Sequence, residues 1–200
     1  MNIISPSFGL KLLVTAVFLI FRTSAGCTNE NCLRLERSTL PPATCPAPTA
    51  PNVIANGDFE CGFAPWTVQI PDPAANYYIG TPGYLGNFSF QVHFTPPAIS
   101  TEYGVSARII TAPATVQPNV PYQLVFWTWF DNGDAGFIGV MINDVAVYTI
   151  DARDHGYGGP FTSNIVNYTP TNDTVTIKFE FLFGNVASWD RIDSVTFSPA

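Results

Sequence analysis

Apolar side chains alternate with other side chains one by one along several stretches of this chain, and this feature limits the possible folds most. In residues 88–94, 122–130 and 175–183, large apolar side chains occupy every second position. A repeat of two is typical of a β-strand with one buried face, whereas an amphipathic helix repeats every three to four residues. These three stretches therefore predict strands.

Shorter apolar segments add further strands to this prediction. Residues 137–141 and 145–150 flank Asn143-Asp144 and are typical of a hairpin. The other expected strands are residues 66–70, 77–79, 105–110 and 189–197, and an extended segment, residues 53–56, ends at a turn at Asn56-Gly57. No long segment favours a helix. We therefore expect an all-β fold, either a two-sheet sandwich or a barrel.

The composition excludes several other classes of protein. The 200 residues include 16 Phe, 8 Tyr and 4 Trp, which is too apolar for an intrinsically disordered acidic chain. Only Lys178 among the lysines follows residue 26, and this excludes a coiled coil or a long helical bundle. Lys and Arg number 8 against 15 Asp and Glu, and without the N-terminal Lys11 and Arg22 the balance is 6 − 15 = −9. Such a chain cannot neutralise a phosphate backbone, so we expect neither nucleic acid nor an anionic membrane surface as a partner.

The N-terminus has the features of a secretory signal peptide. After Lys11, residues 12–21 are almost entirely apolar, and this run is shorter than the roughly 20 apolar residues that a membrane span needs. Small residues favour cleavage after Ala25 or, alternatively, after Gly26. We expect residues 1–25 to be removed and the protein to be secreted to the extracellular space or cell wall. An uncleaved anchor and a bacterial lipoprotein signal are the alternatives.

All four cysteines follow this leader. Cys27, Cys32, Cys45 and Cys61 are even in number, which in a secreted chain predicts two disulfides with three possible pairings. We expect Cys27–Cys32, because the loop closes locally, and Cys45–Cys61, because Cys45 lies on a linker that leads towards Cys61. The spacing lacks the paired clusters of a zinc site. Residues 26–51 therefore form a Cys- and Pro-rich segment and linker.

Three sequons for N-linked glycosylation support passage through a secretory pathway. They begin at Asn87, Asn167 and Asn172, each two residues before a Ser or Thr. Three sequons on a small secreted chain favour a eukaryotic source, and we expect a glycoprotein, specifically a fungal one.

Residues 52–200 resemble the CenC-type carbohydrate-binding modules. The resemblance rests on the opening of residues 52–66, on the strand of residues 120–127 and on the final strand of residues 191–197. The opening contains Asn52, Asn56-Gly57, Phe59-Glu60, Gly62 and Trp66, the middle strand contains Tyr122, Leu124 and Phe126, and the final strand contains Ile192-Asp193 and Val195. The resemblance implies a galactose-binding-like jelly roll, usually with one buried calcium ion and a glycan-binding cleft or edge.

Calcium is expected to bind Glu60 and Asp193, with loop carbonyls completing the shell. Calcium prefers oxygen ligands, and an acidic residue after the first strand can meet one on the last strand if the two strands are neighbours. The alternative is that Glu60 pairs with Arg191 or accepts backbone N–H bonds at a turn. The chain departs from the family pattern at Ser194, where the family has a second Asp, and at Cys61, whose disulfide can reshape the loop.

The candidate glycan contacts are Trp127, Trp129, Gln91, His93 and Gln123. On a regular strand both tryptophans lie opposite the apolar side chains that alternate with them, and flat aromatic rings cover the C–H faces of sugars. The amide and imidazole groups would hydrogen-bond sugar hydroxyls. The alternative is that both faces of this sheet are covered and that the two tryptophans belong to the core.

These observations favour a secreted, non-catalytic protein that binds a neutral polysaccharide. The mature charge of −9 would repel acidic glycans. The chain has two His and none of the common nucleophile, metalloprotease or phosphate-loop motifs, so an enzyme is not expected. The alternative function is a cell-wall or adhesion protein that keeps the fold without binding glycans.

Overall fold

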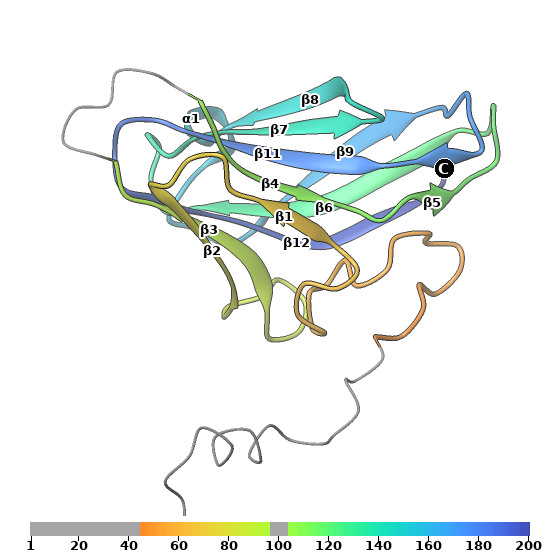
Figure 1. Cartoon of the computed structure of the whole chain (residues 1–200), viewed down its shortest axis with the longest axis horizontal. Helices are drawn as coiled ribbons and strands as arrows, with labels where there is room; N and C mark the ends of the chain where they lie inside the picture. The colour runs from red at the N-terminus through yellow and green to blue at the C-terminus, as the bar shows by residue number, and fades with distance from the viewer. Residues whose placement is uncertain (1–44, 97–103) are drawn as a thin grey trace, which may run out of the picture. The chain divides into compact units, whose positions relative to one another are not determined.

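The alternating stretches form two five-stranded antiparallel sheets. The computed structural model describes residues 45–96 and 104–200, and Figure 1 shows the two sheets as stacked layers. One sheet, the β11 sheet, has the strand order β1-β4-β11-β7-β8, and the other, the β12 sheet, has the order β2-β3-β12-β6-β9. The short strands β5 and β10 pair with each other as a separate two-stranded sheet. The strands are β1 (Thr67–Gln69), β2 (Ala75–Gly80), β3 (Ser89–Phe94), β4 (Val105–Ile110), β5 (Ala114–Thr115), β6 (Tyr122–Phe130), β7 (Gly136–Ile142), β8 (Val145–Asp151), β9 (Thr162–Tyr168), β10 (Thr174–Val175), β11 (Ile177–Phe183) and β12 (Ser188–Pro199).

Phenylalanine rings from both sheets meet in the core between them. Phe94 of β3 stacks on Phe183 of β11 with ring centroids 5.0 Å apart, and Phe126 of β6 meets Phe179 of β11 edge-on, also at 5.0 Å. All four rings are buried, and burying one such side chain contributes about 1.5–3 kcal/mol. The fold is a jelly-roll β-sandwich, as the sequence predicts.

Two parts of the sandwich differ from the expected strands. β9 was not expected, because polar Ser163 and Asn167 flank the exposed Ile165 on its outward side and it lies at the edge of the β12 sheet. The extended segment of residues 53–56 is not a strand. Only its first residue hydrogen-bonds along β12, where the Val53 N–H donates to Phe197 O at 2.9 Å.

The N-terminal part of the described chain is tied to the sandwich by one disulfide and one tryptophan. Cys45 and Cys61 form the expected disulfide, with their Cα atoms 5.6 Å apart. Trp66 is buried and donates its indole N–H to the carbonyls of Ala55 and Asn56 at 3.1 and 3.0 Å, so it plugs the core.

Other predictions fall on residues 1–44, outside the described residues. These are the signal peptide, its cleavage after Ala25 or Gly26, and the Cys27–Cys32 disulfide. Within residues 45–96 and 104–200, no helix is long and apolar enough to cross a membrane. The one helix assigned there is the single turn α1 (Ala152–His155).

One carboxyl group lies in the core without a partner. Asp190 of β12 faces inward between Val92 and Phe130 on the neighbouring strands and is fully buried. Neither of its oxygens has a hydrogen-bond partner among the described residues. Burial raises the pKa of this carboxyl well above its ordinary value, and the nearby Asp131 charge raises it further.

Candidate functional site

The outward face of the β12 sheet carries the tryptophans that the sequence singled out. Along β6, Tyr122, Leu124 and Phe126 are buried in the core, whereas Trp127 and Trp129 point outward and are half-buried. In the antiparallel register, Trp127 lies opposite Asp193 of β12, and Trp129 lies opposite Arg191. The expected division of this strand into a core side and an outer side is confirmed.

Aromatic side chains from four strands gather on this outer face. His93 of β3 stacks on Trp189 of β12 at 4.3 Å between ring centroids, and Tyr78 of β2 lies 5.5 Å from the same indole. The Arg191 guanidinium lies over the Trp129 ring, 4.1 Å from its centroid, in cation–π geometry. We call Tyr78, His93, Trp129, Trp189 and Arg191 the aromatic face.

Trp129 has a fixed position on the aromatic face. Its indole N–H donates to Gly159 O at 2.8 Å, while Arg191 covers one side of the ring. The side chains on the face are half-buried except Tyr78, which is 44% exposed. The face is therefore a partly exposed and largely preformed surface.

Trp127 does not belong to the aromatic face, because a loop covers it. Tyr84, in the loop of residues 81–88 between β2 and β3, stacks on the Trp127 ring with centroids 3.5 Å apart. Phe161 lies beside Tyr84, with centroids 6.2 Å apart. Both tryptophans of β6 are half-buried, but different groups cover them: Tyr84 of the loop stacks on Trp127, as the covered alternative expects, whereas Arg191 lies over one side of Trp129.

Two carboxylates hold this loop in place. Asp193 accepts hydrogen bonds from the backbone N–H groups of Tyr84 and Leu85, and Glu60 accepts from those of Asn87 and Phe88, both at 2.7 Å. Burial raises the pKa of Asp193 to about 6, although its backbone hydrogen bonds act in the opposite direction. Glu60 therefore accepts backbone N–H bonds, as one alternative from the sequence proposes.

A cavity lies beside Glu60, but Asp193, the other expected calcium ligand, is not among its lining residues. This cavity of about 560 Å³ is lined by Asp58, Glu60 and Ser194 and by no Lys or Arg. The Ser194 hydroxyl is buried and has no hydrogen-bond partner among the described residues. However, no three His, Cys, Asp or Glu side chains in the described part of the chain converge as a metal site. The carboxylates of Glu60 and Asp193 accept hydrogen bonds from backbone N–H groups of the loop, and calcium binding stays a prediction.

The two glutamines among the candidate contacts do not join the aromatic face. Gln91 lies between Tyr78 and Arg191 in the strand register, but it is only 5% exposed and its amide donates to Thr81 O at 3.1 Å. Gln123 lies six residues along β6 from Trp129, where it donates to the Asn167 side chain at 3.3 Å. Gln91 therefore supports the loop, and Gln123 lies at the far end of the sheet.

The sequon asparagines are accessible. Asn87, Asn167 and Asn172 are all exposed, Asn87 in the loop over Trp127 and Asn167 on the edge strand β9. Accessibility is necessary for glycosylation, which stays a prediction at these three positions.

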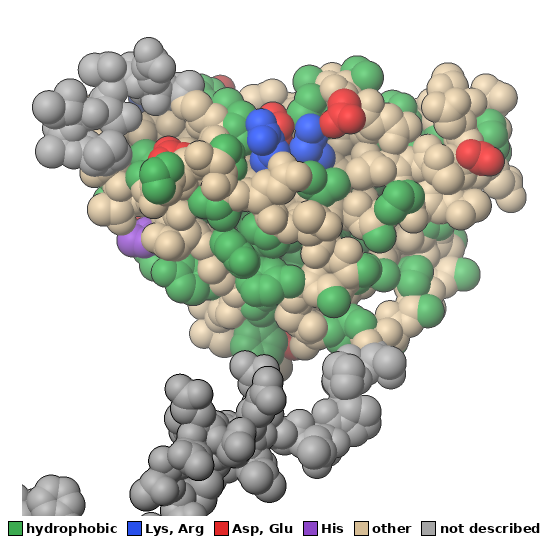
Figure 2. Space-filling view, in the orientation of Figure 1, with side chains coloured by type: hydrophobic (Ala, Val, Ile, Leu, Met, Phe, Trp, Pro, Cys, Tyr) green, Lys and Arg blue, Asp and Glu red, His purple; other side chains and the backbone are tan. Residues whose placement is uncertain are grey.

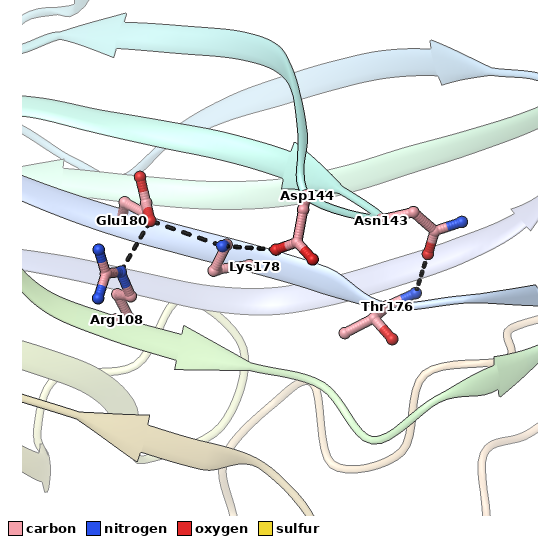
Figure 3. A network of polar contacts seen from close by, with 6 residues as sticks. All are labelled: Arg108, Asn143, Asp144, Thr176, Lys178 and Glu180. Carbon is pink, nitrogen blue, oxygen red and sulfur yellow. Dashed lines mark hydrogen bonds and ion pairs between the residues drawn. The ribbon is translucent and has the colours of Figure 1, made fainter.

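The outer face of the β11 sheet is different in character, because its charges neutralise one another. Arg108 pairs with Glu180 at 2.8 Å, and Lys178 pairs with Asp144 at 2.7 Å and with Glu180 at 3.7 Å (Figure 3). In the space-filling view, Lys or Arg side chains lie next to Asp or Glu side chains in the upper part of the molecule (Figure 2). Asn143, in the β7–β8 hairpin, accepts the Thr176 N–H beside them at 2.8 Å. This network is internally satisfied and leaves no unpaired cation.

Sequence reasoning missed Tyr78, Trp189 and Arg191. The alternation of Trp189, Arg191 and Asp193 along the last strand was available as a signal, since all three share one face. The contribution of Tyr78 was not available, because it depends on β2 pairing with β3 in a particular register.

Comparison with known proteins supports the fold and no more. No protein-family model and no curated protein sequence matches the chain. Among solved structures, the chain is similar to the K3 cleaved adhesin domain of Lys-gingipain from Porphyromonas gingivalis, at 18% identity and a TM-score of 0.52, over 72% of this chain and 95% of that one. It is also similar to a family 61 carbohydrate-binding module in complex with β-1,4-galactotriose, at 20% identity and a TM-score of 0.45, over 74% of this chain and 99% of that one. A family 16 carbohydrate-binding module is similar at 19% identity and a TM-score of 0.49, over 73% of this chain and 99% of that one. At these identities the likenesses show the fold alone.

Proposed function

We propose that this protein is a non-catalytic glycan-binding module that holds a neutral polysaccharide on the aromatic face. The observation that carries the proposal is the convergence of Tyr78, His93, Trp189 and Trp129, from four different strands, on one outer surface. Surfaces of soluble proteins that gather large aromatic side chains commonly mark binding sites. Flat rings match the C–H faces of sugars, while their polar edges tolerate water.

The charge of the molecule supports a neutral ligand. The chain has a net charge of −7, and an acidic surface repels anionic glycans over about one Debye length. Arg191 is the one Lys or Arg on the aromatic face, so the described face has no cationic cluster to offset this repulsion.

The test is retention on insoluble cellulose, xylan and β-1,4-galactan. Trp129→Ala and Trp189→Ala should each weaken binding at least about 10-fold, the size of a central aromatic contact at an interface. Tyr148→Ala is the matched control, because Tyr148 is an exposed aromatic residue on β8 of the other sheet. Circular dichroism must show that the variants stay folded.

A cell-wall or adhesion protein is the second candidate. It is favoured by the rings that the protein covers with its own side chains, Tyr84 on Trp127 and Arg191 on Trp129. If the wild type is retained on no polysaccharide and Trp129→Ala unfolds the domain, these rings are structural and this second function replaces the first.

A structural calcium ion is a separate part of the proposal. Glu60 and Asp193 would hold it, with loop carbonyls around it, and the ion would strengthen the attachment of the loop that covers Trp127. Secretion also belongs here: the Cys45–Cys61 disulfide is typical of an oxidising compartment. Intact mass measurement of the secreted protein would test leader removal and glycosylation together.

A further inference from the structure

Four residues at adjacent register positions of β6 and β12 form a small square: Trp129, Asp131, Trp189 and Arg191. Trp129 and Arg191 are registered partners on β6 and β12. Asp131 follows β6 directly, and its backbone N–H donates to Trp189 O at 3.1 Å. Cross-strand neighbours lie about 5 Å apart, within reach of one sugar ring. The square therefore joins two indoles, one guanidinium and one carboxylate.

Arg191 differs from the other cations of the described chain. Arg108, Arg153 and Lys178 each form an ion pair with a carboxylate, whereas no ion pair closes on Arg191. Its Nε is buried and has no hydrogen-bond partner among the described residues. A guanidinium carries five N–H donors, and leaving a buried donor unpaired is costly. The buried Nε itself is closed to a ligand. The side chain as a whole is only half-buried, however, and its two Nη groups form no hydrogen bond with the described residues, so they can donate to a ligand.

Asp131 provides the complementary group. Because Asp131 lies opposite Trp189 and Trp129 lies opposite Arg191, Asp131 and Arg191 are diagonal neighbours on adjacent strands. Oδ1 of Asp131 accepts a hydrogen bond from the Asn132 side chain at 2.7 Å, and the Asp131 charge opposes the lowering of the Arg191 pKa by burial. Asp131 and Arg191 are nevertheless not in ion-pair contact. An ionised carboxylate only accepts hydrogen bonds and a guanidinium only donates them, whereas a sugar hydroxyl does both. A hydroxyl can thus join Arg191 to Asp131, but a uronate carboxylate cannot donate to Asp131 and is repelled by it.

We propose that Arg191 and Asp131 read the hydroxyl groups of a sugar lying on Trp129 and Trp189, and thereby select neutral sugars against uronates. This inference rests on the proposed glycan-binding function, whose specificity it assigns to two residues.

Calorimetric titration of Arg191→Gln and Asp131→Asn would test it. The probes are cellohexaose, xylohexaose and β-1,4-galactohexaose, with a β-1,4-glucuronan hexamer as the acidic counterpart. For the best neutral probe, Arg191→Gln should weaken binding at least about 10-fold, the effect of a hydrogen bond to a charged group. Asp131→Asn should weaken neutral binding and strengthen glucuronan binding, a change in selectivity that a purely structural role would not produce. Arg108→Gln, on the β11 sheet, should change neither the affinity for the neutral probe nor the affinity for glucuronan.

The outcomes separate this inference from the proposed function. If the wild type binds no neutral probe, the proposed function fails. If the wild type binds a neutral probe and both variants bind it equally well, the proposed function stands and the role of Arg191 and Asp131 is refuted. If the wild type prefers glucuronan, both the neutral ligand and the role of these two residues are refuted. If Arg191→Gln does not fold, Arg191→Lys keeps the charge but loses the planar fork, and unchanged affinity in that variant overturns the role of Arg191.

Discussion

Replacing Asp190 with asparagine should stabilise the domain by an amount that grows with pH. The Asp190 carboxyl is fully buried without a partner among the described residues, and burial raises its pKa well above the ordinary 3.8. The folded state therefore keeps a proton that the unfolded chain releases above pH 3.8. The pKa of Asp190 is higher in the folded state than in the unfolded chain. The full contribution of this carboxyl to the free energy of unfolding is therefore present below pH 3.8, and it is lost as the pH rises towards the folded-state pKa.

The magnitude follows from proton linkage. One proton held only by the folded state changes the free energy of unfolding by about 1.4 kcal/mol per pH unit. Asparagine has no such proton, so the two proteins should diverge by this amount between about pH 4.5 and pH 5.5. In a domain of this size 1 kcal/mol moves Tm by about 2–4 °C, so the difference in Tm should widen by about 3–6 °C. Thermal unfolding followed by tryptophan fluorescence measures it.

The control is Asp154→Asn, because Asp154 is exposed on α1. Its difference in Tm from the wild type should stay constant over the same pH range. A constant or shrinking difference for Asp190→Asn would refute the reasoning, since it would mean that Asp190 is ionised and paired in the folded protein.

Three further predictions concern the loop and its supports. Removing the Cys45–Cys61 disulfide by substituting both residues with serine should lower the free energy of unfolding by about 3 kcal/mol in urea titrations, the loop-closure value for a separation of 16 residues, and an unchanged midpoint would contradict it. Gly86→Ala should destabilise the domain by about 1–3 kcal/mol, because the φ of Gly86 is +88° and the Cβ of the new alanine would lie 2.5 Å from Glu60 Oε1. Gly159→Ala is the control and should be neutral, because a Cβ at Gly159 would meet no atom within 4 Å. Calcium should raise Tm and EDTA lower it in the wild type but not in Glu60→Gln, and an equal response in both would exclude Glu60 as a ligand.

Local pattern was sufficient to predict the strands and their sides. Alternation along residues 122–130 places Phe126 inward and Trp129 outward whatever the neighbouring strand, because a pleated strand sends successive side chains to opposite faces. The Asn143-Asp144 hairpin was equally predictable, since both residues adopt positive φ in a turn that they tolerate well. The edge strand β9 was missed because polar Asn164 faces inward and apolar Ile165 faces outward, so the strand lacks the alternation of the others.

Which outward side chains become neighbours was decided only by the tertiary structure. Arg191 lies on Trp129, and Trp189 lies beside His93, because β12 runs between β3 and β6, and strand order is a property of the whole sheet. The sequence treats Trp127 and Trp129 alike, whereas Tyr84, which lies 43 residues earlier in the chain, stacks on Trp127 alone. Periodicity therefore determined the face on which each side chain lies, and long-range pairing determined which of those side chains are covered and which form the candidate site.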